Sequence, residues 1–301
     1  MKKTTLTIGI PAFNEAKNIG NLLNDILSQK QTNYSLKKVI ISSDGSTDDT
    51  VKIVNSLKIN KINMFANHDR QGISRGINQI IKNTNSEVLI LLDADIKIVD
   101  PGFIQKLIEP IISNNIDLTS CVQKELEPNN FYSRALWLSM QIKNNVFTNF
   151  NNANNMYTCH GPVRALSKKL YTKIRIPKEC TNDMYTYLYC IYHGLKYRFV
   201  SNTEYFYQLS STFSDYLKQS TRFYRGLRKQ SDCFPEKFIM KNLSIPISAY
   251  LHGFFNSINM ILTYPIHTIY YLISQIFMYT ISYLYQPDIN AWEISSSSKK
   301  L

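Results

Sequence analysis

A short apolar segment, Val88–Leu92, ends abruptly in two carboxylates one residue apart, Asp93 and Asp95. Polar residues 83–86 precede it, so the segment is predicted to be a strand buried on both faces of a parallel sheet. The carboxyl end of such a strand opens onto a crevice, and alternate residues of an extended chain point to the same side. Asp93 and Asp95 could therefore present oxygen ligands to one divalent cation, whereas the alternative is an ordinary polar turn.

The residues before this segment alternate between strand and helix patterns. Strands are predicted over 5–10, 38–42 and 62–66, each followed by apolar residues at helical spacing, and a further helix is predicted over 131–147. This alternation predicts an α/β fold with a doubly wound, mostly parallel sheet whose post-strand loops gather at one edge. The sequence lacks G-x-G-x-x-G after the first strand and lacks G-x-x-x-x-G-K-[ST] throughout. Dinucleotide oxidoreductases and P-loop enzymes therefore lose their main sequence support.

The loops after the first, second and fourth strands carry three motifs. They read Pro-Ala-Phe-Asn-Glu at 11–15, Asp-Gly-Ser-Thr-Asp-Asp-Thr at 44–50 and Asp-Ala-Asp at 93–95. This set resembles the family 2 glycosyltransferases of the GT-A fold, which carry P-x-x-N-E, D-G-S-x-D-x-[ST] and D-x-D in this order. The resemblance implies an enzyme, a glycosyltransferase of hexosyltransferase type, that uses a nucleotide-sugar donor.

The resemblance also assigns residues to the donor. Those expected to contact the nucleotide are Pro11, Phe13, Glu15, Asp44, Arg75 and Asp93. Asp44 would accept a hydrogen bond from the base, usually uracil, because a carboxylate accepts from an imide N–H and cannot donate. Arg75 would lie near the diphosphate, with a solvated helical arginine as the alternative. Asp93 and Asp95 would hold Mg or Mn, which neutralises charge on the departing nucleoside diphosphate. The alternative for the polar residues after Asp44 is helix capping.

A fourth motif, Asn182-Asp183, precedes a helical pattern over 184–192. Family members usually have Glu-Asp here, and the Asp is their general base, so the resemblance makes Asp183 the expected catalytic residue. This base would take the proton of the acceptor hydroxyl as it attacks the anomeric carbon opposite the leaving diphosphate, which makes the transfer inverting. The alternative for Asp183 is a helix cap, and the departure from Glu leaves the role of Asn182 open.

Two further segments resemble parts of the family that contact the acceptor or the diphosphate. His160-Gly161-Pro162 stands where family members have a small-residue turn against the acceptor, and a structural histidine is the alternative. Residues 219–223, Gln-Ser-Thr-Arg-Phe, resemble the Q-x-x-R-W of membrane-bound enzymes that build polysaccharides. A basic helix face is the alternative for this segment. The residues assigned to the acceptor or diphosphate are His160, Gly161, Gln219, Arg222 and Phe223. Because Phe223 replaces the Trp, the prediction of processive polymerisation is weakened.

The segment from Asn242 to Pro287 contains no Asp, Glu, Lys or Arg. Pro265 divides it into two pieces of about twenty residues, long enough for two membrane spans. In the first piece, polar residues recur at helical spacing, so it could instead lie in the plane of the membrane interface. Both arrangements predict membrane attachment. Lys237 and Lys241 before the segment, and Lys299 and Lys300 after it, would keep both ends cytosolic.

Charge and cysteine usage narrow the partners and the compartment. The formal net charge of +12 predicts an anionic partner, and no basic run is dense enough to favour nucleic acid. Five cysteines without a C-x-x-C pair suit a reducing cytosol, and no secretory signal is recognisable at the amino terminus. The expected location is therefore the cell membrane, with the catalytic domain on the cytoplasmic side.

Three regions are predicted along the chain. They are a GT-A glycosyltransferase domain over 1–235, with a nucleotide-binding half over 1–100 and an acceptor-binding half over 101–235, membrane-associated helices over 236–287 and a tail over 288–301. The predicted function is inverting transfer of a sugar from a nucleotide sugar, a UDP-sugar by preference, to a membrane-linked or envelope glycan acceptor in polysaccharide biosynthesis. A processive polysaccharide synthase and a non-catalytic, membrane-associated nucleotide-binding protein are the alternatives.

Overall fold

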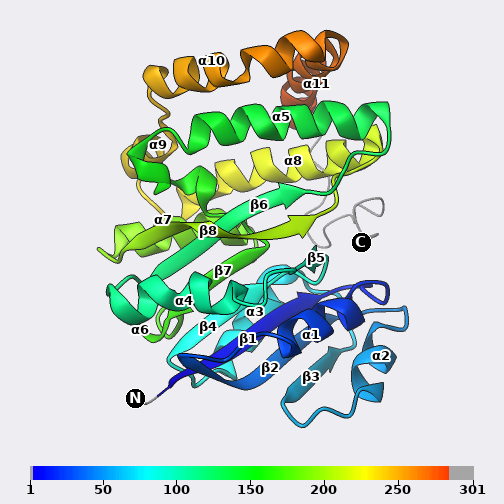
Figure 1. Cartoon of the computed structure of the whole chain (residues 1–301), viewed down its shortest axis with the longest axis vertical. Coiled ribbons are helices and arrows are strands. Elements are labelled where there is room, and N and C mark those ends of the chain that lie inside the picture. Colours follow the sequence, from blue (N-terminus) through cyan, green and yellow to red (C-terminus); the bar gives the residue numbers. More distant parts are fainter. Residues whose placement is uncertain (1–2, 285–301) are drawn as a thin grey trace. The chain divides into compact units, whose positions relative to one another are not determined.

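The computed structural model describes residues 3–284, which form two compact units (Figure 1). The first unit contains residues 3–124 and 159–207, and the second contains residues 125–158 and 208–284. This division differs from the predicted boundary at residue 235, because segments 125–158 and 208–235 belong to the unit that also contains the C-terminal helices. The tail predicted over 288–301 lies outside the described residues.

Among the described residues, eight strands form one sheet in the order β3-β2-β1-β4-β7-β6-β8-β5. Their bounds are β1 Thr4–Ala12, β2 Tyr34–Asp44, β3 Ile62–Asn67, β4 Val88–Leu92, β5 Ile96–Lys97, β6 Leu118–Glu125, β7 Val163–Ser167 and β8 Tyr197–Tyr207. Strand β1 pairs in parallel with β2 and β4, and β2 pairs in parallel with β3. Strand β7 is antiparallel to β4 and β6, and β5 is antiparallel to β8. The α/β prediction is confirmed, and the sheet is parallel in its amino-terminal half and mixed overall.

Helices of the first unit cover this sheet. Their bounds are α1 Ile19–Leu27, α2 Thr50–Ser56, α3 Ile73–Lys82, α4 Phe103–Ser113, α6 Lys168–Tyr171 and α7 Asn182–Tyr192. All five residues of β4 are buried, as predicted for a strand covered on both faces. Helix α3 lies so close to β1 that a Cβ on Gly9 would be 2.3 Å from Ile80 Cγ2. Because β1 is parallel to β2 and β4, the carboxyl ends of these three strands meet at one edge of the sheet, and the close packing of α3 holds that part of the sheet firmly.

The second unit is helical. Its helices are α5 Phe131–Phe147, α8 Phe213–Lys229, α9 Glu236–Leu243, α10 Ile247–Thr263 and α11 Pro265–Leu284, and the bounds of α5 confirm the predicted helix over 131–147. Helix α10 packs on α5 through Gly253, where an added Cβ would lie 2.3 Å from Val146 Cγ2. Helix α11 packs on α5 through His267, whose ring stacks on Phe131 with centroids 4.3 Å apart.

None of the described helices is long and apolar enough to cross a membrane, so the two predicted spans are not found in this part of the chain. Pro246 and Pro265 confine α10 to 17 residues, and about twenty are needed to cross the hydrocarbon core. Helix α11 has 20 residues, but His267, Ser274 and Gln275 interrupt its apolar sequence.

Candidate active site

The loops after β1 and β2 are bonded to each other through the first two motifs. The Asn14 backbone N–H donates to Ser46 Oγ at 3.1 Å, and Asn14 Oδ1 accepts from the Thr47 backbone N–H at 2.8 Å. Asn14 has a φ of 53°, in the left-handed region that asparagine tolerates better than most residues. The Glu15 backbone N–H donates to Thr50 Oγ1 at 2.7 Å. These bonds explain the residue spacing of both motifs and fix the conformation of the loop that carries Phe13.

Asp44 ends β2 with a buried carboxylate. Its Oδ1 accepts from the Gln71 backbone N–H at 2.8 Å, and its Oδ2 accepts from the Gly72 backbone N–H at 2.7 Å. A Cβ on Gly45 would lie 2.9 Å from the Arg70 backbone nitrogen, so the loop after β3 packs directly against the end of β2. Each carboxylate oxygen has a second acceptor position, so these contacts are compatible with the predicted bond from a base.

Arg70 is a cation beside the predicted base pocket that the sequence analysis missed. Its guanidinium carbon lies 4.1 Å from the centroid of the Phe13 ring, within the range of a cation–π contact. Burial lowers the pKa of Arg70 below its ordinary value, and the Asp44 carboxylate opposes that shift. Arg75, the cation chosen from the sequence, lies on α3 with an exposed side chain. The position of Arg70 in a post-strand loop was the available signal for including it.

A cluster of carboxylates follows β4. Desolvation raises the pKa of Asp93 to about 7, and the negative charge of Asp95 adds to that shift. The charges of Asp183 and Glu15 also raise the pKa of Asp93, whereas the Arg164 charge lowers it. The structure therefore brings the predicted metal ligands, the predicted base and Glu15 of the predicted donor site close enough for their charges to shift the pKa of Asp93.

The turn at residues 160–162 lies between two of these carboxylates. The Asp93 backbone N–H donates to the Pro162 carbonyl oxygen at 2.9 Å. A Cβ on Gly161 would lie 3.3 Å from Asp183 Oδ2, a contact closer than ordinary van der Waals distance. Gly161 is thus the residue whose missing side chain leaves room for the Asp183 carboxylate.

Asp183 lies in the first turn of α7, where the positive end of the helix dipole favours a negative charge. The N-cap residue of α7 is Thr181, so Asp183 is not the helix cap that was the alternative. The Asp183 Oδ1 accepts from the Met184 backbone N–H at 2.8 Å, while Oδ2 faces Gly161. One carboxylate oxygen is therefore anchored and the other is directed at the turn.

His160 begins the same turn. Desolvation lowers the pKa of His160 to about 4, so its imidazole is neutral at neutral pH. A neutral imidazole can donate one hydrogen bond and accept another, whereas it adds no positive charge to the carboxylate cluster.

Arg164, on β7, is the largest side chain that is fully buried in the described part of the chain. Its Nη1 donates to Thr186 Oγ1 at 3.1 Å, and its Nη2 donates to Asn182 Oδ1. Among the described residues, its Nε has no hydrogen-bond partner. Because the side chain of Asn182 is uncharged, it holds the guanidinium without neutralising it. This contact shows what Asn182 does in place of the usual Glu, and no local sequence pattern indicated Arg164.

The first unit contains every residue predicted for the donor, the metal and the base. Pro11 lies in β1 opposite Ser42 of β2, near the start of α3. Of the residues predicted for the acceptor or diphosphate, His160 and Gly161 also lie in the first unit. Gln219, Arg222 and Phe223 lie on α8 in the second unit, where Arg222 and Phe223 are exposed. Their contacts with a diphosphate or acceptor stay predictions.

The carboxylates after β4 are suitable ligands for a hard divalent cation. In the described chain, however, no group of three or more His, Cys, Asp or Glu residues is arranged to hold a metal ion. Asp93 and Asp95 offer carboxylate oxygens, the ligands that Mg and Mn prefer. Desolvation is the main cause of the raised pKa of Asp93, and the neighbouring carboxylates add a surplus of negative charge. A cation at this point would relieve it, so the two residues fit a metal that takes its other ligands from water and phosphate.

Solved structures with a similar fold define the class of this protein. A mannosyltransferase, PcManGT of Pyrobaculum calidifontis, solved with GDP-Man and Mn²⁺, has a TM-score of 0.66 at 14% identity, covering 94% of this chain and 88% of its own. Staphylococcus aureus TarS 1–349, solved with UDP, has a TM-score of 0.56 at 17% identity, covering 84% of this chain and 72% of its own. These likenesses, and the loops gathered at one edge of the sheet, define a protein of the GT-A fold.

The family follows from the sequence comparison. The model of glycosyl transferase family 2 matches residues 7–175, more than half of the chain, and the chain belongs to this family of glycosyltransferases. A poly-β-1,6-N-acetyl-D-glucosamine synthase of Staphylococcus aureus is 31% identical over 91 residues, which are 30% of this chain and 21% of the synthase. A 4,4'-diaponeurosporenoate glycosyltransferase of the same species is 27% identical over 172 residues, 56% of this chain and 45% of that enzyme. The chain thus spans less than half the length of either relative.

Proposed function

We propose that the protein transfers a sugar from a nucleotide-sugar donor to an acceptor hydroxyl with inversion at the anomeric carbon. The observation that carries the proposal is the turn at 160–162, with the Asp93 backbone bonded to Pro162 and Asp183 Oδ2 against Gly161. An inverting displacement needs a proton acceptor beside the attacking hydroxyl and stabilisation of charge on the leaving diphosphate. Asp183 is the group for the first task, and a divalent cation held by Asp93 and Asp95 would perform the second.

In the proposed reaction Asp183 is the general base. As the acceptor oxygen bonds to the anomeric carbon, Asp183 Oδ2 takes the hydroxyl proton, and the bond between that carbon and the diphosphate oxygen breaks. The nucleoside diphosphate departs with the bonding electron pair. The bond from Met184 N–H to Oδ1 holds the carboxylate in place, which is the kind of preorganisation that lowers a barrier.

Asp93 and Asp95 would hold Mg or Mn, and the cation would supply neutralisation of charge on the leaving diphosphate. Mn²⁺ accompanies GDP-Man in the mannosyltransferase structure, which supports a divalent cation here. The Arg164 charge lowers the pKa of Asp93, and its partner Asn182 is an amide that adds no further negative charge, so Arg164 limits the repulsion between the carboxylates.

A uridine nucleotide is the proposed donor. Asp44 at the end of β2 would accept from the imide N–H of the base, beside Phe13 and Arg70. UDP in the TarS structure supports this choice, whereas GDP-Man in the mannosyltransferase supports a guanosine nucleotide. The two bases present similar N–H donors to a carboxylate, so a donor panel has to decide between them.

The proposed acceptor is a membrane-linked molecule or an envelope glycan, reached at the cytoplasmic face of the cell membrane. The name of one Staphylococcus aureus relative specifies a polysaccharide, and the name of the other specifies diaponeurosporenoate. These names support either kind of acceptor. The likeness to a polysaccharide synthase also favours a second candidate, processive polymerisation. Chain length separates the candidates, because single transfer extends each acceptor by one sugar.

The test is release of nucleoside diphosphate from a panel of UDP- and GDP-sugars with Mg or Mn and a native membrane extract. We expect metal-dependent release from one donor. Replacing the base by Asp183→Asn should reduce the rate by at least about a hundredfold, with nucleotide binding unchanged. Asp49→Asn, at an exposed site on the N-cap of α2, is the matched control and should leave the rate unchanged. Nuclear magnetic resonance of the product reports the anomeric configuration.

Each outcome bears on a separate part of the proposal. A product with the donor's anomeric configuration would contradict inversion. A fully active Asp183→Asn enzyme would remove Asp183 from the role of base. Undiminished nucleotide binding without release from any donor, in the presence of the extract, would favour the non-catalytic binding protein.

A further inference from the structure

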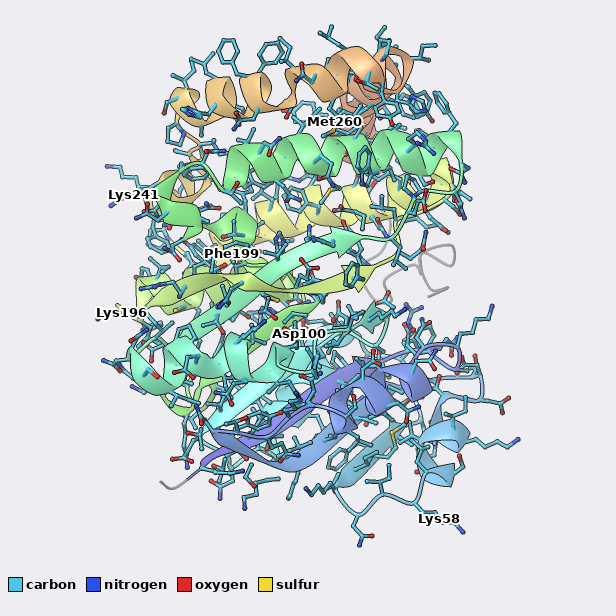
Figure 2. The ribbon with its side chains drawn as sticks, viewed as in Figure 1. Lys58, Asp100, Lys196, Phe199, Lys241 and Met260 are labelled. Carbon is cyan, nitrogen blue, oxygen red and sulfur yellow. The ribbon has the colours of Figure 1, made fainter. Side chains whose placement is uncertain are left out.

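Helix α10 places its smallest side chains inward and its largest outward. Ala249, Gly253 and Ser257 are buried, and the packing of Gly253 on Val146 shows that this face lies against α5. Ser257 Oγ also accepts from Asn145 Nδ2 at 2.9 Å. The exposed large apolar residues of this helix are Ile247, Tyr250, Leu251, Phe254, Phe255, Ile258 and Leu262. At 3.6 residues per turn these form one continuous face, and Figure 2 shows side chains, several of them aromatic, projecting from α10 away from α5.

Helix α11 has the same reversed arrangement. Its inward side includes the buried Ser274 and the half-buried His267 and Gln275. The His267 ring stacks on Phe131, and Gln275 donates a hydrogen bond to Tyr216. The exposed large apolar residues are Ile266, Ile269, Leu272, Ile273, Ile276, Phe277 and Tyr279. Helices at a water-facing surface bury their apolar stripe, whereas both of these helices expose theirs, and α10 also exposes a polar stripe that includes His252, Asn256 and Asn259.

We infer that the outward faces of α10 and α11 lie in the interface of an anionic lipid membrane, with both helix axes parallel to the membrane plane. The inference does not depend on the proposed transfer reaction. Fourteen exposed large apolar residues on two consecutive helices far exceed the scattered apolar residues of an ordinary surface. Binding to lipid would remove these side chains from water.

Lipid fits this surface better than a protein partner does. Protein interfaces carry polar rims and regular hydrogen bonds, with arginine enriched. The exposed faces of α10 and α11 carry no charged side chain, because residues 242–287 contain none. Tyrosines such as Tyr250 and Tyr279 have apolar rings and polar hydroxyls, the combination that is enriched at the level of lipid headgroups. Small inward residues, such as Gly253, allow the close helix packing that is common within membrane proteins.

The orientation in the membrane plane follows from packing within the second unit. One side of α10 is bonded to α5. Helix α11 contacts α8 through the hydrogen bond from Gln275 to Tyr216, and it contacts α5 through Lys143, which lies over the Tyr271 ring. Only the opposite sides are available to lipid, so a flat arrangement buries both apolar faces without breaking this packing. Lys237 and Lys241 are exposed on α9, just before α10, and their charges suit anionic headgroups.

The test is flotation of the full chain with vesicles of phosphatidylcholine alone or mixed with phosphatidylglycerol. We expect binding to the mixed vesicles. Phe255→Asp, halfway along the outward face of α10, should weaken that binding by roughly tenfold or more, because a phenylalanine that the membrane would bury is replaced by a charge. The matched control is Asn256→Asp, which adds the same charge at the next residue, on the polar stripe of the same helix, and should bind within about twofold of wild type.

Replacing Lys237 and Lys241 by Gln should reduce binding to the mixed vesicles and should abolish the preference for them over phosphatidylcholine. Equal binding of Phe255→Asp and Asn256→Asp would overturn the inference. Failure of the wild-type chain to bind either vesicle would also overturn it. If that failure were accompanied by dimers that Phe255→Asp dissociates in light scattering, the outward faces would be an interface between two copies of this chain instead.

Discussion

Gly161→Ala should damage the reaction without damaging the fold. The added methyl group would lie 3.3 Å from Asp183 Oδ2 and 3.6 Å from Asp183 Cγ, so the carboxylate has to move by a few tenths of an ångström. Its other oxygen is bonded to Met184 N–H at 2.8 Å, which limits how far it can turn without losing that bond. The backbone at Gly161 lies outside the positive-φ region, so alanine introduces no backbone strain.

The expected size of the effect follows from this geometry. Misplacing a catalytic group by about 1 Å lowers a rate by about a hundredfold, so a shift of a few tenths should lower kcat by about five- to tenfold, or about 1 to 1.4 kcal/mol in the barrier. Because alanine restricts the unfolded chain more than glycine does, the free energy of unfolding should stay constant or rise by up to about 1 kcal/mol. The assay measures nucleoside diphosphate release at saturating donor, together with thermal unfolding.

Gly102→Ala is the matched control. A methyl group there would also lie 3.3 Å from a carboxylate oxygen, that of Asp100, which is outside the proposed site and is labelled in Figure 2. This variant should keep its full kcat. An unchanged kcat in Gly161→Ala, or an equal loss in both variants, would refute the assignment of Asp183 Oδ2 to proton transfer.

Three further predictions follow from contacts described above. Arg70→Ala should raise the Kd for the donor nucleotide about fivefold, because it removes the cation on the Phe13 ring; calorimetry with an unchanged Kd would exclude Arg70 from the pocket. Gly253→Ala should lower the free energy of unfolding by about 1 to 3 kcal/mol through its clash with α5, whereas Gly20→Ala, with 3.8 Å to the nearest atom, should not lower it; a thermal melt compares the two. His160 has a folded-state pKa of about 4, below its unfolded value of 6.5, so its contribution to stability, up to about 3 kcal/mol, is present above pH 6.5 and is lost as the pH falls towards 4. His160→Gln should flatten that pH dependence in urea titrations, and an unchanged slope would argue against a desolvated imidazole.

The features that could be predicted from sequence are those encoded by local patterns. The strand Val88–Leu92 and the helix Phe131–Phe147 have the predicted bounds, because an apolar run and a helical stripe are properties of neighbouring residues. The three loop motifs predicted the family correctly. The roles of their residues in donor and metal binding stay predictions.

The missed features depend on contacts between distant parts of the chain. Arg164 meets Asn182 because β7 inserts antiparallel beside β4, and no local pattern reports that pairing. The sequence left a helix cap open as the alternative for Asp183, and only the structure shows that Thr181 is the N-cap residue of α7. The place of Arg70 in a post-strand loop was an available signal, but its position on the Phe13 ring depends on the packing of that loop against Gly45. The two compact units do not coincide with the predicted boundary at residue 235, because residues more than a hundred positions apart, such as Asn145 of α5 and Ser257 of α10, pack together.

The path of the chain between its two units has a practical consequence for truncation. The chain leaves the first unit after residue 124, returns at 159 and leaves again after 207. A shortened protein ending at residue 207 would retain α5 while losing α10 and α11, which pack on it, and α8, whose Phe213 and Tyr216 contact Tyr132 of α5. Removing the apolar C-terminal helices to obtain a more tractable catalytic fragment should therefore yield a protein with a newly uncovered helix and a tendency to aggregate. Point substitutions on the outward face of α10 are the better route to a tractable protein, because they leave α5 covered.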